Sequence, residues 1–175
     1  MSIHTLQYQA QADYNAWFNE RLYDACSTVS DDERRRDAGA FFGSVHATLN
    51  HILMGDRIWL GRLATTPGGF GALDGATLVT GTYQLDAELY ADFDELRAER
   101  RATDAAIVGL ADELTDEVLA STMRYANSSG TAREHPTWIA ITHLFNHQTH
   151  HRGQVHAMLT QAGAVPDDTD IIVMP

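Results

Sequence analysis

The stretch Phe145 to Leu159, FNHQTHHRGQVHAML, contains the pattern from which the fold and the function of this chain are best inferred. Together with the preceding His143, it places His147, His150 and His151 within nine residues. Apolar residues recur around these histidines with the spacing of an amphipathic helix. In a helix His147 and His151 lie one turn apart on the same face, where two imidazoles can share one metal ion.

A helical wheel indicates which of these histidines pair. At about 100° per residue, His147 and His151 fall at the edge of the apolar arc of the predicted helix. His143 lies on the same ridge and is a spare ligand, whereas His150 turns further toward solvent. Histidines of a polar surface, or core histidines bonded to carbonyls, would give a similar pattern. The helix alone therefore leaves metal binding and a structural role open.

A third ligand is expected from the segment Ala40 to Leu63, because a catalytic zinc normally has three protein ligands and a water. This segment is apolar almost all round, which predicts a buried helix. It carries His46 and His51, which are five residues apart and cannot share a face. His51 falls on the side with Ala47, where space remains for an ion, and is preferred. The alternative is a buried histidine bonded to a carbonyl.

The rest of the chain predicts an all-α protein, an up-down four-helix bundle with a small β-hairpin inserted before the last helix. A single domain is expected over residues 1–175. The hairpin is expected to turn at Asn127 to Gly130. Thr65 to Gly81, with Pro67 and several glycines, is predicted to be a mobile loop. The four predicted helices run over Thr5 to Val29, Ala40 to Leu63, Leu85 to Leu114 and Pro136 to Ala162.

Four further residues stand out within the predicted helices. Asp56 and Arg152 both project into apolar arcs, and because an unpaired buried charge is costly, they are predicted to pair with each other. The alternative for Asp56 is to orient a ligand histidine. Gly153 in mid-helix predicts close approach of another helix or of a ligand. Cys26, the single cysteine, excludes an intrachain disulfide and is expected in the core rather than as a nucleophile.

The formal net charge of −12 argues against a nucleic-acid-binding surface and against anionic membranes. No apolar run approaches the roughly 18 residues of a membrane span. The N-terminal residues lack the basic and apolar segments of a signal peptide. These features predict a cytoplasmic protein that binds neither nucleic acid nor membrane.

Three sequence motifs resemble those of the DinB/YfiT-like family of four-helix-bundle metalloproteins. The first is NHQTHHRGQ, at Asn146 to Gln154, which matches the family's signature in the last helix. The second is LNHIL, at Leu49 to Leu53, followed by DRIWL at Asp56 to Leu60. The third is YNAW with NERL, within Tyr14 to Leu22. The motifs occur in the family's order and span nearly the whole chain.

The resemblance implies a divalent metal ion held by His51, His147 and His151. Zinc is the default and nickel is an alternative, because imidazole ligands suit several transition metals. The resemblance also implies a homodimer that acts on a small molecule, with a low-molecular-weight thiol such as bacillithiol or mycothiol as cosubstrate in some relatives. No catalytic residue is assigned.

The first functional hypothesis is a metal-dependent enzyme, either a thiol S-transferase or a hydrolase. A hydrolase needs a general base, and the only nearby candidates, His143, His150 and Asp56, are not compelling. Thiol transfer is preferred, because a metal-bound thiolate needs no separate base when it attacks. An open coordination position is expected near Tyr14, Trp17 or the loop after the second helix. The second hypothesis is a non-catalytic metal-binding stress-response protein with a closed site, in which either solvent is excluded or a fourth protein ligand is present, His143 or Glu134 being the first candidates. The third is a helical interaction module that binds no metal.

Overall fold

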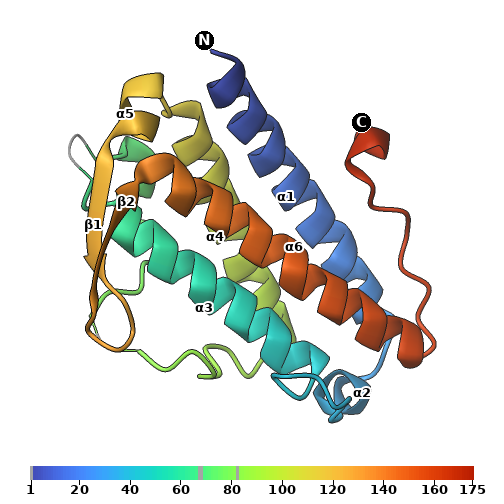
Figure 1. Cartoon of the computed structure of the whole chain (residues 1–175). Coiled ribbons are helices and arrows are strands. Elements are labelled where there is room, and N and C mark those ends of the chain that lie inside the picture. The colour runs from blue at the N-terminus through green and yellow to red at the C-terminus, as the bar shows by residue number, and fades with distance from the viewer. Residues whose placement is uncertain (1, 67–68, 82) are drawn as a thin grey trace.

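The described residues of the computed structural model, 2–66, 69–81 and 83–175, form a bundle of four long helices with a hairpin at one end (Figure 1). Helix α1 packs against α4 and α6, and α3 packs against α6 and α4. None of the helices in these residues is both long and apolar enough to cross a membrane. The long helices are α1 (Ile3–Ser27), α3 (Val45–Leu63), α4 (Phe93–Asp112) and α6 (Thr137–Gln161). The short elements are α2 (Asp31–Arg35), α5 (Asp116–Ala120), and the 3₁₀ turns η1 (Gly71–Leu73) and η2 (Ile171–Val173).

The predicted hairpin is present. Strands β1 (Thr122–Ala126) and β2 (Ala132–Pro136) pair antiparallel, with Met123 opposite His135. The Asn127 side chain stabilises the turn by accepting hydrogen bonds from the backbone amides of Ser129 and Thr131. Because α6 begins directly after β2, the hairpin lies beside the first turns of α6 and the end of α3 (Figure 1).

Helix α3 begins at Val45, later than the Ala40 expected from the sequence. The preceding residues form a tight turn, in which Gly39 and Gly43 have φ values of 69° and 79° and Ala40 bridges to Gly43. Such left-handed backbone conformations interrupt a helix and favour glycine. Ser44 then caps α3, because its side chain accepts a hydrogen bond from the Ala47 amide at 3.1 Å.

Helix α4 begins at Phe93, so the start predicted at Leu85 is also wrong. The Asn50 side chain on α3 accepts hydrogen bonds from the amides of Leu89 and Tyr90 at 2.8 and 2.9 Å. These bonds hold the residues between Leu85 and Phe93 against α3 in a non-helical conformation. Asp92 caps the helix that follows, accepting from the Glu95 amide at 2.8 Å.

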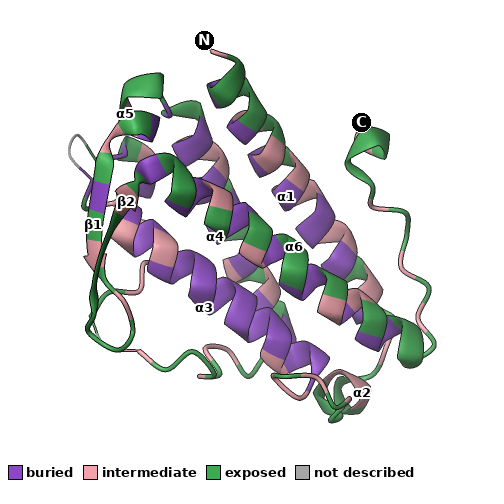
Figure 2. Ribbon diagram, viewed as in Figure 1, coloured by how far each residue is buried: buried purple, intermediate pink, exposed green. Residues whose placement is uncertain are grey.

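Burial is most extensive on α3, which is purple over most of its length in Figure 2. This agrees with the expectation that this apolar helix is buried. The other three long helices also contribute buried apolar side chains to the core, including Leu22, Ile107 and Val155. Cys26 is fully buried in this core, as predicted, and burial raises the pKa of its thiol to about 12. A thiol of this kind is not a nucleophile at neutral pH.

A buried polar network crosses the bundle, and it corrects the predicted pairing of Asp56 with Arg152. Asp56 instead pairs with Arg100 of α4 at 2.5 Å. Arg152 donates to the side-chain oxygen of Asn15 at 2.8 Å. Arg100 also lies 2.9 Å from Asp104, and Gln148 of α6 donates to Asp56. The apolar pattern correctly predicted that Asp56 and Arg152 are buried. It did not predict that Arg100 of α4, rather than Arg152 of α6, is the cation that pairs with Asp56.

The close approach of another helix predicted at Gly153 is also wrong. Gly153 is exposed on α6, and an added Cβ would meet no atom of another residue within 4 Å among the described residues. This glycine does not bring a second helix close to α6, and the alternative, close approach of a ligand, stays a prediction.

Candidate metal centre

The structure brings together the three histidines preferred from the sequence, referred to below as the three-histidine group: His51, His147 and His151. His51 lies on α3, and the other two lie on the facing side of α6. Each offers one ring nitrogen, and these nitrogens lie within 4.8 Å of one another. The Nε2 atoms of His51 and His147 are 3.1 Å apart. Two imidazole nitrogens bound to one ion at 2.0–2.1 Å are about 3.0 to 3.4 Å apart, so this separation fits a shared metal.

Two of these rings are oriented by hydrogen bonds at the opposite nitrogen. The Nδ1 of His51 lies 2.8 Å from the Leu85 carbonyl oxygen, and the Nδ1 of His151 lies 2.7 Å from Oε1 of Gln154. Because both partners are acceptors, each Nδ1 carries the proton and each Nε2 keeps its lone pair. Such partners fix the tautomer and the direction of metal-ligating histidines.

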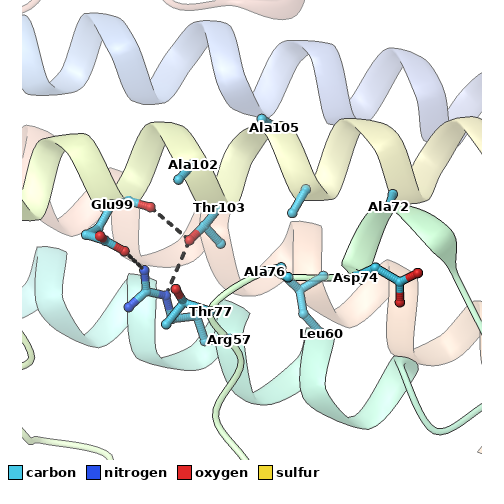
Figure 3. Close-up of a pocket in the computed structure, with 12 residues that line it drawn as sticks. Arg57, Leu60, Ala72, Asp74, Ala76, Thr77, Glu99, Ala102, Thr103 and Ala105 are labelled. Atoms are coloured by element: carbon cyan, nitrogen blue, oxygen red, sulfur yellow. Dashed lines mark hydrogen bonds and ion pairs between the residues drawn. The ribbon is translucent and has the colours of Figure 1, made fainter.

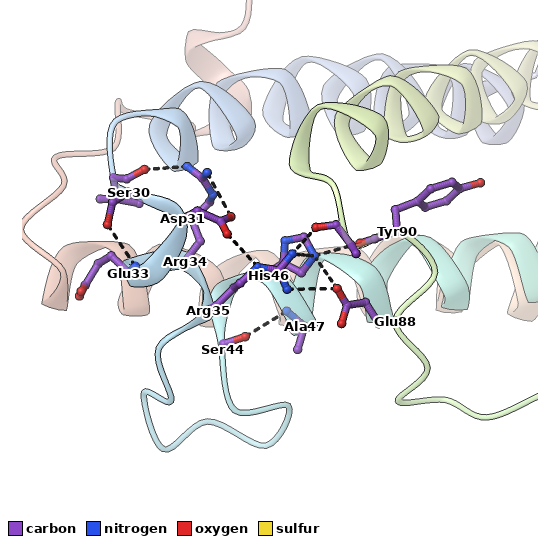
Figure 4. A network of polar contacts seen from close by, with 12 residues as sticks. Ser30, Asp31, Glu33, Arg34, Arg35, Ser44, His46, Ala47, Glu88 and Tyr90 are labelled. Atoms are coloured by element: carbon purple, nitrogen blue, oxygen red, sulfur yellow. Dashed lines mark hydrogen bonds and ion pairs between the residues drawn. The ribbon is translucent and has the colours of Figure 1, made fainter.

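His46 takes no part in this group and instead anchors the segment that follows Leu85 (Figure 4). Its Nε2 lies 2.9 Å from the Tyr90 carbonyl oxygen and 3.3 Å from the Glu88 carboxylate. Arg35 of α2 also pairs with Glu88, at 3.1 Å. These contacts fix the segment on α3 and thereby help to hold the Leu85 carbonyl against His51.

Gly55 provides the space that the His147 ring occupies. An added Cβ at Gly55 would lie 2.5 Å from Cε1 and 3.1 Å from Nδ1 of His147. Any larger residue would therefore displace the ring. Sequence reasoning did not identify Gly55, although a glycine one turn after His51 in a buried helix was a usable signal.

Phe42 covers one side of the three-histidine group. Its ring stacks on His51 with 3.8 Å between centroids and meets the edge of His151 at 5.6 Å. Phe42 belongs to the turn before α3, which places its ring over the histidines. The neighbouring Phe41 is 87% exposed. No sequence pattern indicated Phe42, because its position depends on how that turn folds back over the helix.

Electrostatics keep the three-histidine group neutral. Burial, together with the nearby His151 and His51, lowers the pKa of His147 to about 3. Burial also lowers the pKa values of His51 and His151. At neutral pH the imidazoles are therefore unprotonated, which is the form that binds metals.

Neither candidate for a fourth protein ligand joins the group. Glu134 pairs with Arg124 at 2.7 Å on the exposed hairpin. His143 packs against Trp59, with 4.8 Å between ring centroids and an angle of 57° between the ring planes. Within the described ranges the possible metal-binding group that contains His51 has three members, all histidines.

Other residues considered for the site lie elsewhere or have other partners. Tyr14 donates to the Thr169 carbonyl oxygen of the C-terminal segment, and Trp17 packs against Tyr14. Asp56 belongs to the buried network, where its partners are Arg100 and Gln148, and it is not a member of the three-histidine group. Pro67 and Gly68 of the predicted loop lie outside the described residues, so the expected mobility of that loop stays a prediction.

The sequence profile of the DinB family matches residues 1–174. The chain belongs to the DinB family. Protein DinB of Bacillus subtilis (strain 168) is 24% identical over 159 residues, which cover 90% of this chain and 87% of that protein. The crystal structure of a DinB-like protein from Bacillus cereus ATCC 10987 superposes with a TM-score of 0.55. That match covers 86% of this chain and 89% of the other at 22% identity, and it supports the family fold.

Proposed function

We propose that His51, His147 and His151 bind a divalent transition metal ion. The observation that carries this proposal is the convergence of three neutral imidazoles, two of which are oriented by acceptors at their far nitrogens. An all-imidazole donor set suits zinc, nickel, iron and copper, and we propose zinc, with nickel as the alternative.

We further propose that the protein is a metal-dependent enzyme acting on a small molecule, of the thiol S-transferase type or, as second choice, the hydrolase type. A metal ion with three protein ligands and an open position lowers the pKa of a bound water or thiol toward neutrality. Among the described residues no carboxylate joins the three-histidine group. A hydrolase would need such a base, whereas a thiolate attacks without one, so the arrangement favours thiol transfer.

We also propose that the protein is a homodimer, as the family resemblance implies, and that it is located in the cytoplasm. The apolar residues Ile171 and Ile172 of the C-terminal segment are exposed in a single chain, which is compatible with a second subunit. Analytical ultracentrifugation of the untagged protein tests the dimer, because a single species with the mass of one chain would exclude it.

The alternative is a non-catalytic metal-binding protein of a stress response. The Phe42 ring favours this alternative, because it closes one side of the three-histidine group. The two proposals differ in whether a small thiol can reach the metal. With cobalt as the bound ion, added thiol changes the visible spectrum only if it becomes a ligand.

Metal content measured by plasma mass spectrometry on untagged protein tests the metal site. We expect about one equivalent in the wild type and none in the double variant His147→Ala/His151→Ala. The matched control is His4→Ala/His156→Ala, which removes two histidines outside the group and should keep the metal. Wild-type protein that holds no metal after incubation with zinc or nickel would refute the site.

The proposed reaction is tested with the metal-loaded protein, a low-molecular-weight thiol and an alkyl halide. In that reaction the thiol sulfur forms a bond to carbon, the halide leaves, and the thiol proton passes to solvent. Loss of free thiol faster than in the His147→Ala/His151→Ala variant supports the transferase. The hydrolase would be favoured if the wild type and this variant consumed every thiol at the same rate and only the wild type hydrolysed an ester.

A further inference from the structure

A cavity of about 450 Å³ lies between the end of α3, the loop residues Val79 to Gly81, and the hairpin. We call it the Arg62 cavity. Gly61 allows the loop to approach α3, since an added Cβ there would lie 2.6 Å from the Val79 carbonyl oxygen. Polar groups that line the cavity include those of Arg62, Tyr83, Arg124, Asn127 and Ser128.

The Arg62 guanidinium is held in a fixed position beside this cavity. Its central carbon lies 4.5 Å from the Trp59 ring centre and 4.4 Å from the Tyr125 ring centre. One terminal nitrogen donates to the Tyr83 hydroxyl at 2.6 Å. Cation–π contacts with two rings orient the planar group, so little further ordering is needed when it binds a ligand.

The charge of Arg62 is not compensated by a carboxylate in the part of the chain that the structure describes. All 12 basic residues are arginines in a chain of net charge −12, and most others form ion pairs. Arg57, on the same helix, lines a neighbouring cavity of about 470 Å³ and pairs there with Glu99 (Figure 3). Arg124, at the rim of the Arg62 cavity, pairs with Glu134. The contrast indicates that the Arg62 cavity is suited to an anion from outside the chain.

The Arg62 cavity is connected to the three-histidine group by a row of aromatic rings. Trp59 lies against His143 with 4.8 Å between centroids, and His143 lies 5.8 Å from His147. Arg62 follows His51 by eleven residues, which places it on the same face of α3 and about 16 Å further along the axis. A small molecule in an extended conformation can span much of this distance.

We infer that the Arg62 cavity binds the carboxylate or phosphate group of a small organic anion. The guanidinium can donate two parallel hydrogen bonds to two oxygens of such a group. Trp59 and Tyr125 provide an apolar surface beside it. We assign this anion as the acidic end of the substrate, and that assignment rests on the function proposed above.

Isothermal titration of the full chain tests this inference with three probes of similar shape: benzoate, phenyl phosphate and the neutral benzamide. The wild type is expected to bind at least one anion and not benzamide. Arg62→Gln should weaken anion binding at least tenfold. Arg36→Gln, which makes the same charge change at an exposed position, should leave it unchanged. Tyr83→Phe removes the hydroxyl that accepts a hydrogen bond from Arg62 but keeps the contacts of Arg62 with Trp59 and Tyr125. We expect this variant to bind the anion severalfold more weakly than the wild type.

The two anions distinguish a carboxylate ligand from a phosphate ligand. Equal binding by Arg62→Gln and the wild type, or wild-type binding of benzamide as tightly as of the anions, would overturn the inference. If Arg62→Gln does not fold, unchanged binding by Tyr83→Phe has the same consequence. The His147→Ala/His151→Ala variant should still bind the anion, so failure of the metal proposal would be seen separately. Loss of anion binding in that variant would place the anion at the histidines and refute the Arg62 cavity.

Discussion

The contact between Gly55 and His147 gives the sharpest test of the proposed metal centre. In the variant Gly55→Ala, the added Cβ would lie 2.5 Å from the Cε1 atom of His147. Carbon atoms in contact are normally about 3.5 to 4.0 Å apart, so the ring must retreat by about 1 Å. Metal–ligand distances tolerate only about 0.2 Å, so we expect the ring to leave the position in which His147 is proposed to bind the metal.

The effect on folding should be small by comparison. Overpacking a buried site costs about 1–3 kcal/mol, whereas alanine stabilises a helix interior by about 1 kcal/mol relative to glycine. The free energy of unfolding of the metal-free protein should therefore fall by no more than about 2 kcal/mol. Zinc affinity should fall at least about 100-fold, the upper range seen when supporting contacts of a metal site are lost.

Competition with a fluorescent zinc chelator measures the affinity, and urea unfolding measures the stability. Gly153→Ala is the matched control, because it makes the same change in mid-helix, where among the described residues a Cβ would meet nothing within 4 Å beyond its own stretch of α6. It should stabilise the protein by up to about 1 kcal/mol and leave zinc affinity unchanged. If Gly55→Ala behaves like Gly153→Ala in both measurements, His147 is not a ligand in the observed position.

Three further predictions concern the groups around this centre. Asp56→Asn breaks the buried pair with Arg100, so the free energy of unfolding in urea should fall by about 3 kcal/mol with metal content unchanged; no loss would show that the pair does not stabilise the fold. The unfolded chain protonates His147 near pH 6.5 but the folded chain only near pH 3, so the metal-free protein should lose stability as pH falls between these values. His147→Gln should show a shallower loss in pH-dependent urea unfolding, and an identical slope would contradict the lowered pKa. Asn50→Ala frees the segment after Leu85, so hydrogen exchange there should accelerate and zinc affinity fall about tenfold; unchanged exchange would show that Asn50 does not hold the segment.

Helical periodicity accounts for what could be predicted of the fold. The last helix was expected over Pro136 to Ala162 and is observed as Thr137–Gln161, and the hairpin before it is present. The starts of α3 and α4 were placed too early. The apolar spacing of each helix continues into the residues that precede it, but those residues are not helical. Gly39 and Gly43 form a turn before α3, and Asn50 holds the residues before α4 in a non-helical conformation. Periodicity cannot detect such local competitors of a helix.

The sequence by itself determined that His147 and His151 share a face of one helix, because four residues make about one turn in any α-helix. It also predicted that the helix carrying His51 is buried, since apolar residues occur almost all round that segment, and it favoured His51 over His46 as the third member of the group. Only the tertiary structure decided that Phe42, Gly55 and the Leu85 carbonyl surround the three rings. It likewise decided which cations are paired inside the bundle. The physical reason is that contacts between elements depend on how the helices are rotated and shifted against each other, and packing of the whole core sets both.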